Sequence, residues 1–273
     1  MSYPRLIALD LDGTLLNSKK ELSPANDAAL RKAHAEGAEI VLATGRFYGA
    51  LPELLRTLPY VRYYLTVNGA KLYDRQTGRV LYQAEIPWQQ ALTIMEYFET
   101  LPVIYDCYLG DAAYMTAALL AQADAYAHNA FCSRMMRLRK PVPELKAYLR
   151  ERRQDVQKTM CLFRPEDMPL REKLLRSLPG NFPGAVVTSS IPNNIEFNHE
   201  NATKGAALLA LAEALGIPRE ETLAFGDDYN DISMLKAAGV GVAMGNAYDA
   251  VKKAADAVTE DCDRDGVAAF LDS

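Results

Sequence analysis

Two aspartates separated by one residue, Asp10 and Asp12, follow the apolar segment 5–9. A short apolar run of this kind is typical of a buried strand in a parallel sheet. Residues i and i+2 at a strand end point to the same side, so both carboxylates can take part in one reaction. One could attack an electrophile while the other protonates the leaving oxygen and then activates water. The spacing permits this covalent route, and a water nucleophile remains open.

A second group of acidic residues, Asp227, Asp228 and Asp231, follows another apolar segment later in the chain. If these side chains meet Asp10 and Asp12, their negative charges repel one another. Mg²⁺ would remove this repulsion, because it prefers oxygen ligands and commonly binds one or two carboxylates together with a substrate phosphate. The acidic residues therefore predict a magnesium site.

Groups that could bind a phosphate occur at two further points. Thr44 follows the apolar segment 39–43, and Lys204 begins a segment rich in alanine and leucine. Their side chains, with backbone N–H groups beside glycines, supply hydrogen-bond donors and positive potential. Together with the acidic residues they indicate phosphoryl transfer, in which an enzyme mainly positions groups and stabilises charge on the equatorial oxygens.

The elements that must position these residues alternate regularly. We expect strands at residues 5–9, 39–43, 64–67, 221–225 and 240–244. We expect helices at residues 23–37, 48–58, 204–215, 232–238 and 249–255. Ser23 and Thr203 are suitable N-caps for the first and third of these helices. The alternation predicts an α/β fold with a Rossmann-like, doubly wound parallel sheet, which binds ligands outside the carboxyl ends of its strands.

The pattern changes between residues 83 and 191. We expect helices there at 88–101, 117–130 and 142–153, and strands at 158–163 and 185–189. We interpret this segment as an α+β domain inserted into a core made of residues 1–82 and 192–273. We interpret its densest basic patch as a solvated face; the patch comprises Arg134, Arg137, Arg139 and Lys140.

Composition limits the classes of protein. The 273 residues carry a formal net charge of −5, and 49% of them are hydrophobic. A mildly acidic chain without a basic stripe is not expected to bind nucleic acid. No apolar run approaches the roughly 20 residues that span a bilayer, and residues 1–12 are too short and too quickly acidic for a signal peptide. We expect a cytoplasmic protein without a membrane partner, and the sequence does not indicate its oligomeric state.

The cysteines are far apart in the sequence and form no C-x-x-C pair. Neither a zinc site nor a disulfide framework is expected from this spacing in a chain of this size. The residues concerned are Cys107, Cys132, Cys161 and Cys262.

Four short motifs occur in a fixed order. They are Asp10-Leu-Asp12-Gly13-Thr14-Leu-Leu16, Thr44-Gly45-Arg46, Lys204-Gly205, and Gly226-Asp227-Asp228-Tyr229-Asn230-Asp231. In order, spacing and placement they resemble the four motifs of the haloacid dehalogenase-like (HAD) phosphohydrolases. The resemblance covers residues 5–82 and 192–273.

The inserted domain lies between the second and third motifs, which resembles the Cof-type subfamily of these enzymes. Three further segments also resemble that subfamily: Asn68-Gly69-Ala70, Gly245-Asn246-Ala247 and Asp265-Gly266-Val267. The resemblance implies an α+β cap that selects the substrate. It also implies a phosphatase acting on sugar phosphates or other small phosphorylated metabolites.

The resemblance assigns roles to the acidic residues. Asp10 would be the nucleophile that forms an aspartyl phosphate. Asp12 would be the general acid and then the general base, and its backbone carbonyl would help to hold Mg²⁺. Asp227 would bind Mg²⁺ directly and Asp231 would hold metal-bound water, so the metal residues are Asp10, Asp12, Asp227 and Asp231. Asp228 falls at a variable position and receives no metal role.

The resemblance also implies a set of phosphate- or substrate-binding residues. The set comprises Thr14, Thr44, Gly45, Arg46, Lys204 and Asn230. Thr44 and Lys204 would bind the transferring phosphoryl group. Asn230 would contact the phosphate or order its loop, and Arg46 would contact the substrate or the cap.

Three functions fit these residues. The first is a Mg²⁺-dependent phosphatase with an aspartyl-phosphate intermediate, and the large insert after the second motif favours it. The second is a phosphomutase, which needs the same acid and base. The third is a catalytically idle protein that binds a phosphorylated metabolite. One position is left open, because Asn68 before Gly69 could be either a turn residue or a ligand.

Overall fold

The computed structural model describes residues 4–273, which form two compact units. The first unit contains the described residues up to Arg46 together with Leu51–Gln83 and Asn201–Ser273. The second contains Phe47–Ala50 and Ala84–Glu200. The later boundary thus differs from the expected one at residue 191, because Asn194–His199 is a strand of the second unit's sheet.

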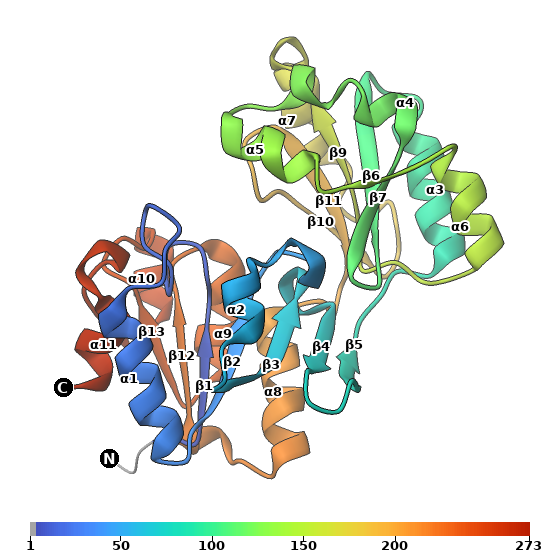
Figure 1. Ribbon diagram of the computed structural model, residues 1–273. Helices are drawn as coiled ribbons and strands as arrows, with labels where there is room; N and C mark the ends of the chain where they lie inside the picture. The colour runs from blue at the N-terminus through green and yellow to red at the C-terminus, as the bar shows by residue number, and fades with distance from the viewer. Residues whose placement is uncertain (1–3) are drawn as a thin grey trace. The chain divides into compact units, whose positions relative to one another are not determined.

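The first unit is an α/β structure (Figure 1). Its strands are β1 (Leu6–Leu9), β2 (Glu39–Ala43), β3 (Val61–Thr66), β4 (Lys71–Asp74), β5 (Val80–Gln83), β12 (Thr222–Gly226), β13 (Val240–Ala243) and β14 (Ala257–Val258). Its helices are α1 (Pro24–Ala35), α2 (Glu53–Thr57), α8 (Lys204–Leu215), α9 (Ile232–Ala237), α10 (Asp249–Ala254) and α11 (Gly266–Leu271). The expected helix at 48–58 is instead a 3-10 turn at Tyr48–Ala50 followed by the short α2.

The strands of the first unit form one sheet in the order β14-β13-β12-β1-β2-β3-β4-β5. The pairs from β14 to β3 are parallel, as the sequence predicted, whereas β4 and β5 extend the sheet antiparallel. These two short strands were not predicted. β5 is an edge strand without a buried residue, so it lacks the apolar signal that identified the central strands.

Helices cover both faces of this sheet. On one face, Leu6 and Ala8 of β1 share a buried cluster with Leu208 and Leu211 of α8. On the other, the ring of Phe225 in β12 meets the ring of Phe270 in α11 edge-on, with 5.5 Å between the ring centroids. Since β1 is fully buried, its run of apolar residues has no alternating pattern. The expected N-caps are confirmed, because the Ser23 hydroxyl accepts the N–H of Asn26 and the Thr203 hydroxyl accepts that of Ala206.

The second unit is an α+β structure with its own sheet (Figure 1). Its strands are β6 (Val103–Leu109), β7 (Ala112–Thr116), β8 (Lys140–Val142), β9 (Lys158–Phe163), β10 (Ala185–Thr188) and β11 (Asn194–His199), in the sheet order β10-β11-β9-β6-β7-β8. Its helices are α3 (Trp88–Phe98), α4 (Ala117–Leu120), α5 (Ala130–Met136), α6 (Leu145–Arg152) and α7 (Met168–Ser177). The expected helix at 117–130 is therefore broken, and β6, β7, β8 and β11 were not predicted.

The two faces of the second sheet differ in chemistry. Cys107, Cys161 and Phe197 belong to a buried apolar cluster that includes residues of α3 and α6. Residues on the opposite face are polar and nonetheless buried, beginning with Asp106 on β6 and Lys158 on β9. Strand β6 is buried along its whole length, so it shows neither alternation nor a purely apolar run. This is why the sequence did not identify it.

Charged residues of this polar face are paired. Arg139 donates to Asp106 with 2.8 Å between Nε and Oδ2, and Lys158 donates to Glu196 with 2.9 Å between Nζ and Oε2. All four side chains are buried. The interpretation of the Arg134–Lys140 patch as a solvated face is therefore wrong for Arg139, because its partner lies on a strand that the sequence did not reveal.

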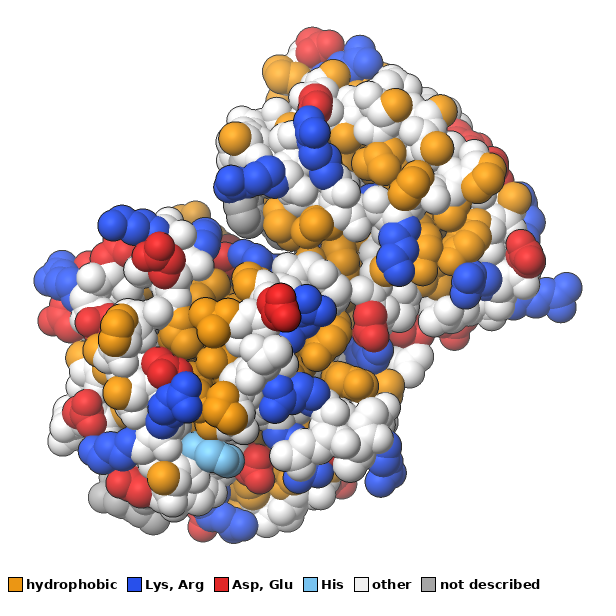
Figure 2. Space-filling model, in the orientation of Figure 1, with side chains coloured by type: hydrophobic (Ala, Val, Ile, Leu, Met, Phe, Trp, Pro, Cys, Tyr) orange, Lys and Arg blue, Asp and Glu red, His pale blue; other side chains and the backbone are white. Residues whose placement is uncertain are grey.

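Exposed charges are of both signs in each unit. On the face that Figure 2 shows, basic and acidic side chains are interspersed over both units. Among the described residues, no helix is both long and apolar enough to span a membrane.

We predict that Arg139→Ala lowers the free energy of unfolding of the second unit by about 3–5 kcal/mol, because it leaves Asp106 buried without its cation. The chain's one tryptophan, Trp88, lies in this unit, so its fluorescence during urea unfolding measures the effect. Arg137→Ala is the matched control, since Arg137 pairs with Asp124 in solvent. Equal midpoints for the two variants would contradict the prediction.

Candidate active site

The candidate residues meet at one edge of the first unit's sheet. Leu9 of β1 is level with Phe225 of β12 and with Leu42 of β2, so these three neighbouring strands end together. Asp10 follows β1, and Asp227 follows β12. The strand order reverses between β1 and β12, which is where open parallel sheets bind ligands.

A close approach between the loop after β1 and Asp227 defines one side of the site. Gly13 has φ of +100°, and a Cβ on it would lie 2.5 Å from Oδ2 of Asp227. The adjacent Thr14 hydroxyl donates to Oδ1 of Asp227 at 2.7 Å. Glycine is therefore needed here for both its conformation and its lack of a side chain. The hydroxyl of Thr14, which we expected to bind phosphate, contacts this carboxylate.

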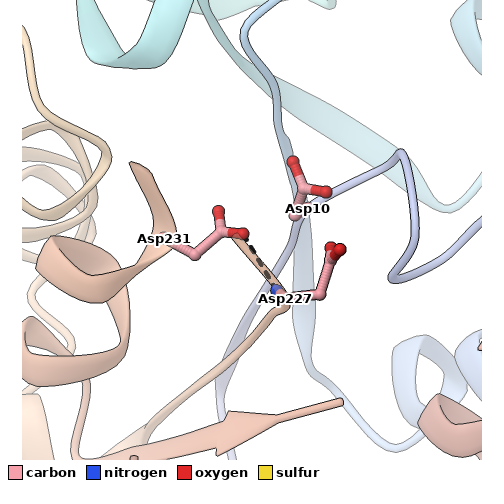
Figure 3. Close-up of side chains that lie close together, drawn as sticks. All are labelled: Asp10, Asp227 and Asp231. Carbon is pink, nitrogen blue, oxygen red and sulfur yellow. Dashed lines mark hydrogen bonds between the residues drawn. The ribbon is translucent and has the colours of Figure 1, made fainter. Parts of the chain in front are cut away.

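Three carboxylates face a common point (Figure 3). One oxygen from each of Asp10, Asp227 and Asp231 lies within 4.8 Å of the others. Oδ2 of Asp231 accepts the N–H groups of Asp227 and Asp228, both at 3.0 Å. Since a Cβ on Gly226 would lie 2.4 Å from Cβ of Asp231, this turn also depends on a glycine. The backbone thus fixes the position of Asp231.

Lys204 is the buried cation of the site. Its Nζ donates to Oδ1 of Asp10 at 2.5 Å and to Oδ1 of Asp231 at 2.6 Å, and the residue is fully buried. Helix α8 begins at this lysine, after the Thr203 cap. A cation in a first helical turn is opposed by the helix dipole. The two carboxylates compensate for that effect and for the loss of hydration.

The carboxylates of the site have perturbed pKa values. Burial raises the pKa of Asp10 to about 8; Lys204 opposes this shift, and the charges of Asp231 and Asp227 add to it. Burial also raises the pKa of Asp227 to about 6, against the hydrogen bond from Thr14 and with a further contribution from Asp231. The protein alone therefore disfavours full ionisation of this cluster.

The donor set fits Mg²⁺. Its members are carboxylate oxygens, which this hard cation prefers, and burial together with their mutual repulsion raises the pKa values of Asp10 and Asp227. A divalent cation would neutralise this charge. Asp10, Asp227 and Asp231 are the side chains that would hold it, directly or through water.

Asp12 lies in a different electrostatic environment. Arg46 donates to both of its oxygens, with Nε to Oδ2 at 2.9 Å and Nη2 to Oδ1 at 2.6 Å. Lys20 lies 3.1 Å from Oδ1. Burial alone would raise the pKa of Asp12, but Arg46 and then Lys20 hold it below the ordinary value. Lys20 was not among the predicted residues; it lies in a loop that carries no sequence signal for the site.

Two other predicted residues contact neighbouring loops. The Thr44 side chain is buried, and its hydroxyl oxygen accepts the N–H of Arg46 at 3.1 Å. Asn230 donates from Nδ2 to Oδ1 of Asn68 at 3.0 Å. Asn68 was the position left open between a turn and a ligand, and it does contact a residue of the fourth motif.

A sheet edge with these carboxylates and a buried lysine defines a phosphoryl-transfer enzyme by its chemistry, and comparison with known families agrees. The model of the haloacid dehalogenase-like hydrolase family matches residues 7–271. The chain therefore belongs to this family.

Similar proteins with full-length matches include phosphatases. Phosphatase YwpJ of Bacillus subtilis (strain 168) is 34% identical, over 98% of this chain and 98% of its own. Pyridoxal phosphate phosphatase YbhA of Escherichia coli (strain K12) is 32% identical, over 98% of this chain and 97% of its own.

Solved structures agree with this comparison. A haloacid dehalogenase-like hydrolase from Bacteroides thetaiotaomicron has a TM-score of 0.83 at 32% identity, covering 99% of both chains. The subclass IIB sugar phosphatase BT4131 has a TM-score of 0.79 at 25% identity, covering 98% of both chains. The protein is thus a phosphatase with the predicted α/β fold.

We predict that Mg²⁺ binding releases protons from this site. The raised pKa values, about 8 for Asp10 and about 6 for Asp227, favour protonation of these carboxyl groups in the metal-free protein as pH falls. A cation must displace these protons, so its apparent affinity should rise as pH rises from 5 towards 8. Calorimetric titration in two buffers of different ionisation enthalpy measures the release. Equal heats in the two buffers at pH 6 would contradict it.

Proposed function

We propose that the protein is a Mg²⁺-dependent phosphatase that hydrolyses small phosphorylated metabolites through an aspartyl phosphate on Asp10. One observation carries the proposal: the Lys204 ammonium group is buried between Asp10 and Asp231, beside the Asp227 carboxylate. A lysine held against a crowded carboxylate cluster provides the positive potential that a transferring phosphoryl group requires.

In the first step, the Asp10 carboxylate attacks phosphorus and the bond from phosphorus to the leaving oxygen breaks. Asp12 gives its proton to that oxygen. In the second step, Asp12 takes a proton from water, the resulting hydroxide attacks phosphorus, and inorganic phosphate leaves with Asp10 restored. Lys204 and Thr44 would bind the equatorial oxygens, and bound Mg²⁺ would neutralise negative charge between the carboxylates and the phosphate.

The environment of Asp12 suits the second step. Arg46 and Lys20 hold it as a carboxylate, the form that accepts a proton from water. For the first step it must carry a proton. We propose that the substrate draws Arg46 away from Asp12, which weakens the ion pair and raises the pKa of Asp12. This assigns Arg46 to substrate binding.

We predict that Asp10→Asn lowers the rate of phosphate release by at least about 10³-fold, as expected when a covalent nucleophile is removed. Acid quenching during turnover should trap labelled phosphate on the wild-type protein but not on this variant. Asp228→Asn is the matched control, because Asp228 lies in the same loop and asparagine keeps a side-chain oxygen that can accept the local backbone N–H groups.

Three results would contradict the proposal. Full activity of Asp10→Asn would exclude this nucleophile. Transfer of the label to a second hydroxyl group, with little free phosphate, would favour a phosphomutase. Tight binding of phosphorylated metabolites without turnover of any would favour the catalytically idle protein.

We propose that the second unit is the cap that selects the substrate. Several polar atoms on its strands, or directly before β9, are buried and, within residues 4–273, have no hydrogen-bond partner. They are Oδ1 of Asp106, both amide atoms of Gln157 and Oδ1 of Asn198. Leaving such atoms unpaired is costly, so a ligand or water is expected to satisfy them.

The chemistry of this face favours a hydroxyl-rich or amide-containing leaving group. Its charges already form the pairs Arg139–Asp106 and Lys158–Glu196, so they leave little net charge for recognition. The unpaired atoms include two donor protons on Gln157 and several acceptor oxygens. Sugar phosphates meet this requirement, in line with the sugar phosphatase among the similar structures, and a heteroaromatic phosphate such as pyridoxal phosphate is the second class to test.

We predict that Gln157→Leu changes selectivity without loss of stability. Its side chain makes no hydrogen bond within the described chain, so an apolar group of similar shape should leave the melting temperature equal or higher. Its kcat/KM for sugar phosphates should fall about tenfold or more relative to that for p-nitrophenyl phosphate, as expected when a polar contact is lost. Unchanged ratios across a substrate panel would remove Gln157 from the proposed recognition surface.

We also propose that the protein works in a reducing, cytoplasmic environment. Its cysteines Cys107, Cys132, Cys161 and Cys262 are free and buried, which is the usual state of cysteines in such compartments.

A further inference from the structure

Three successive residues after β3 have left-handed backbone conformations. The φ angles are +50° for Val67, +57° for Asn68 and +103° for Gly69. Glycine adopts this region freely and asparagine tolerates it, but a β-branched residue such as valine does so only at a cost. Such a conformation persists where surrounding contacts enforce it. The segment therefore has contacts strong enough to hold it.

The backbone of this segment binds the loop of the second motif. The N–H of Val67 donates to the carbonyl of Arg46 at 3.1 Å, and the N–H of Asn68 donates to the carbonyl of Thr44 at 3.0 Å. The left-handed turn directs both N–H groups towards Thr44-Gly45-Arg46. An Asn-Gly turn would explain the angles of Asn68 and Gly69 alone. It does not explain the left-handed φ angle of Val67, which accompanies the hydrogen bond from the N–H of Val67 to the carbonyl of Arg46.

The side chain of Asn68 connects this loop to the fourth motif. Its Oδ1 accepts the amide of Asn230 at 3.0 Å. The same oxygen lies 2.9 Å from where a Cβ on Gly45 would be, so Gly45 is needed for the approach. Behind it, a Cβ on Gly69 would lie 2.2 Å from the carbonyl oxygen of Thr203, the residue that precedes Lys204. Asn68 and Gly69 thus touch the second, third and fourth motifs.

We propose that Asn68 is a positioning residue, which fixes the phosphate-binding loop of Thr44 in position relative to the metal-binding loop of Asp227–Asp231. This inference rests on the proposed function of both loops. Asn68 acts through Asn230 and through the backbone of Thr44 and Gly45. The strained turn places the amide group of Asn68 close to Asn230 and to Gly45.

The relative position of the two loops matters because phosphoryl transfer depends on how the phosphate-binding group and the metal-binding group, which follow different strands, are placed relative to each other. Thr44 follows β2, and Asp231 belongs to the loop after β12, with β1 between these strands. The Asn68–Asn230 hydrogen bond therefore spans the site from the β2–β3 side to the β12 side. A small misplacement of reacting groups lowers the rate of the chemical step more than it weakens substrate binding.

The test compares Asn68→Gly with wild type in steady-state hydrolysis of p-nitrophenyl phosphate with Mg²⁺. Glycine adopts the left-handed backbone freely and removes the side chain with its amide group. We expect kcat to fall about tenfold, with KM and the inhibition constant of inorganic phosphate changed less than about threefold. Asn230→Ala should give a similar loss, and the double variant should lose no more than the worse single variant. Arg153→Gly, at another left-handed position in the second unit, is the control that should match wild type.

Wild-type kcat in Asn68→Gly, additive losses in the double variant, or a raised KM with unchanged kcat would each overturn the inference. Amide hydrogen exchange gives a second readout that needs no turnover. Asn68→Gly should speed exchange at residues 44–46 and 228–231, and unchanged exchange there would also overturn it. Absence of phosphatase activity in the wild-type protein would instead contradict the proposed function, so the two failures are distinguishable.

Discussion

The structure of the site depends on one interaction, the burial of the Lys204 ammonium group between Asp10 and Asp231. A buried ion group is stable only when its partners replace the hydration that it has lost. Here two carboxylates do so, at 2.5 and 2.6 Å. Each of these three residues comes from a different element: Asp10 from the end of β1, Asp231 from the loop after β12, and Lys204 from the first turn of α8. The ion pairs thus determine how these elements meet.

The same interaction bears on the proposed binding of Mg²⁺. One ammonium group cannot balance Asp10, Asp227 and Asp231 together, and burial, with a smaller contribution from this repulsion, raises the pKa values of Asp10 and Asp227. Such a close approach of the charged groups also requires glycine at neighbouring positions, where a side chain would not fit. A Cβ at Gly13 would collide with Asp227, and one at Gly205 would collide with the carbonyl of Ser233 in α9. Glycines in the motifs therefore permit the charge density that the chemistry uses.

The sequence was sufficient to predict the central strands and to indicate the acidic and basic residues that meet in the candidate site, because both have local signals. Buried strands such as β1 and β2 contain apolar runs, and a polar residue directly after such a run lies at the ligand-binding edge of the sheet. What the sequence could not predict depends on partners far along the chain. Arg139 is buried because it forms an ion pair with Asp106. Lys20 lies in the site because its loop brings it close to Asp12. Neither pairing has a local pattern.

The two units also differ in how well their chemistry can be inferred from residue types, and the reason is physical. In the first unit, few kinds of ligand can balance the clustered charges at the sheet edge, so the residue types alone indicate a phosphate group and a metal ion. On the polar face of the second unit the buried charges are neutralised in pairs, so the proposed recognition of the substrate is left to neutral groups such as the Gln157 amide. Amide and hydroxyl groups bind many ligands through similar hydrogen bonds. A family of such enzymes can therefore keep one reaction while the second unit changes its substrate, because altering neutral hydrogen bonds there leaves the charge balance around Lys204 intact.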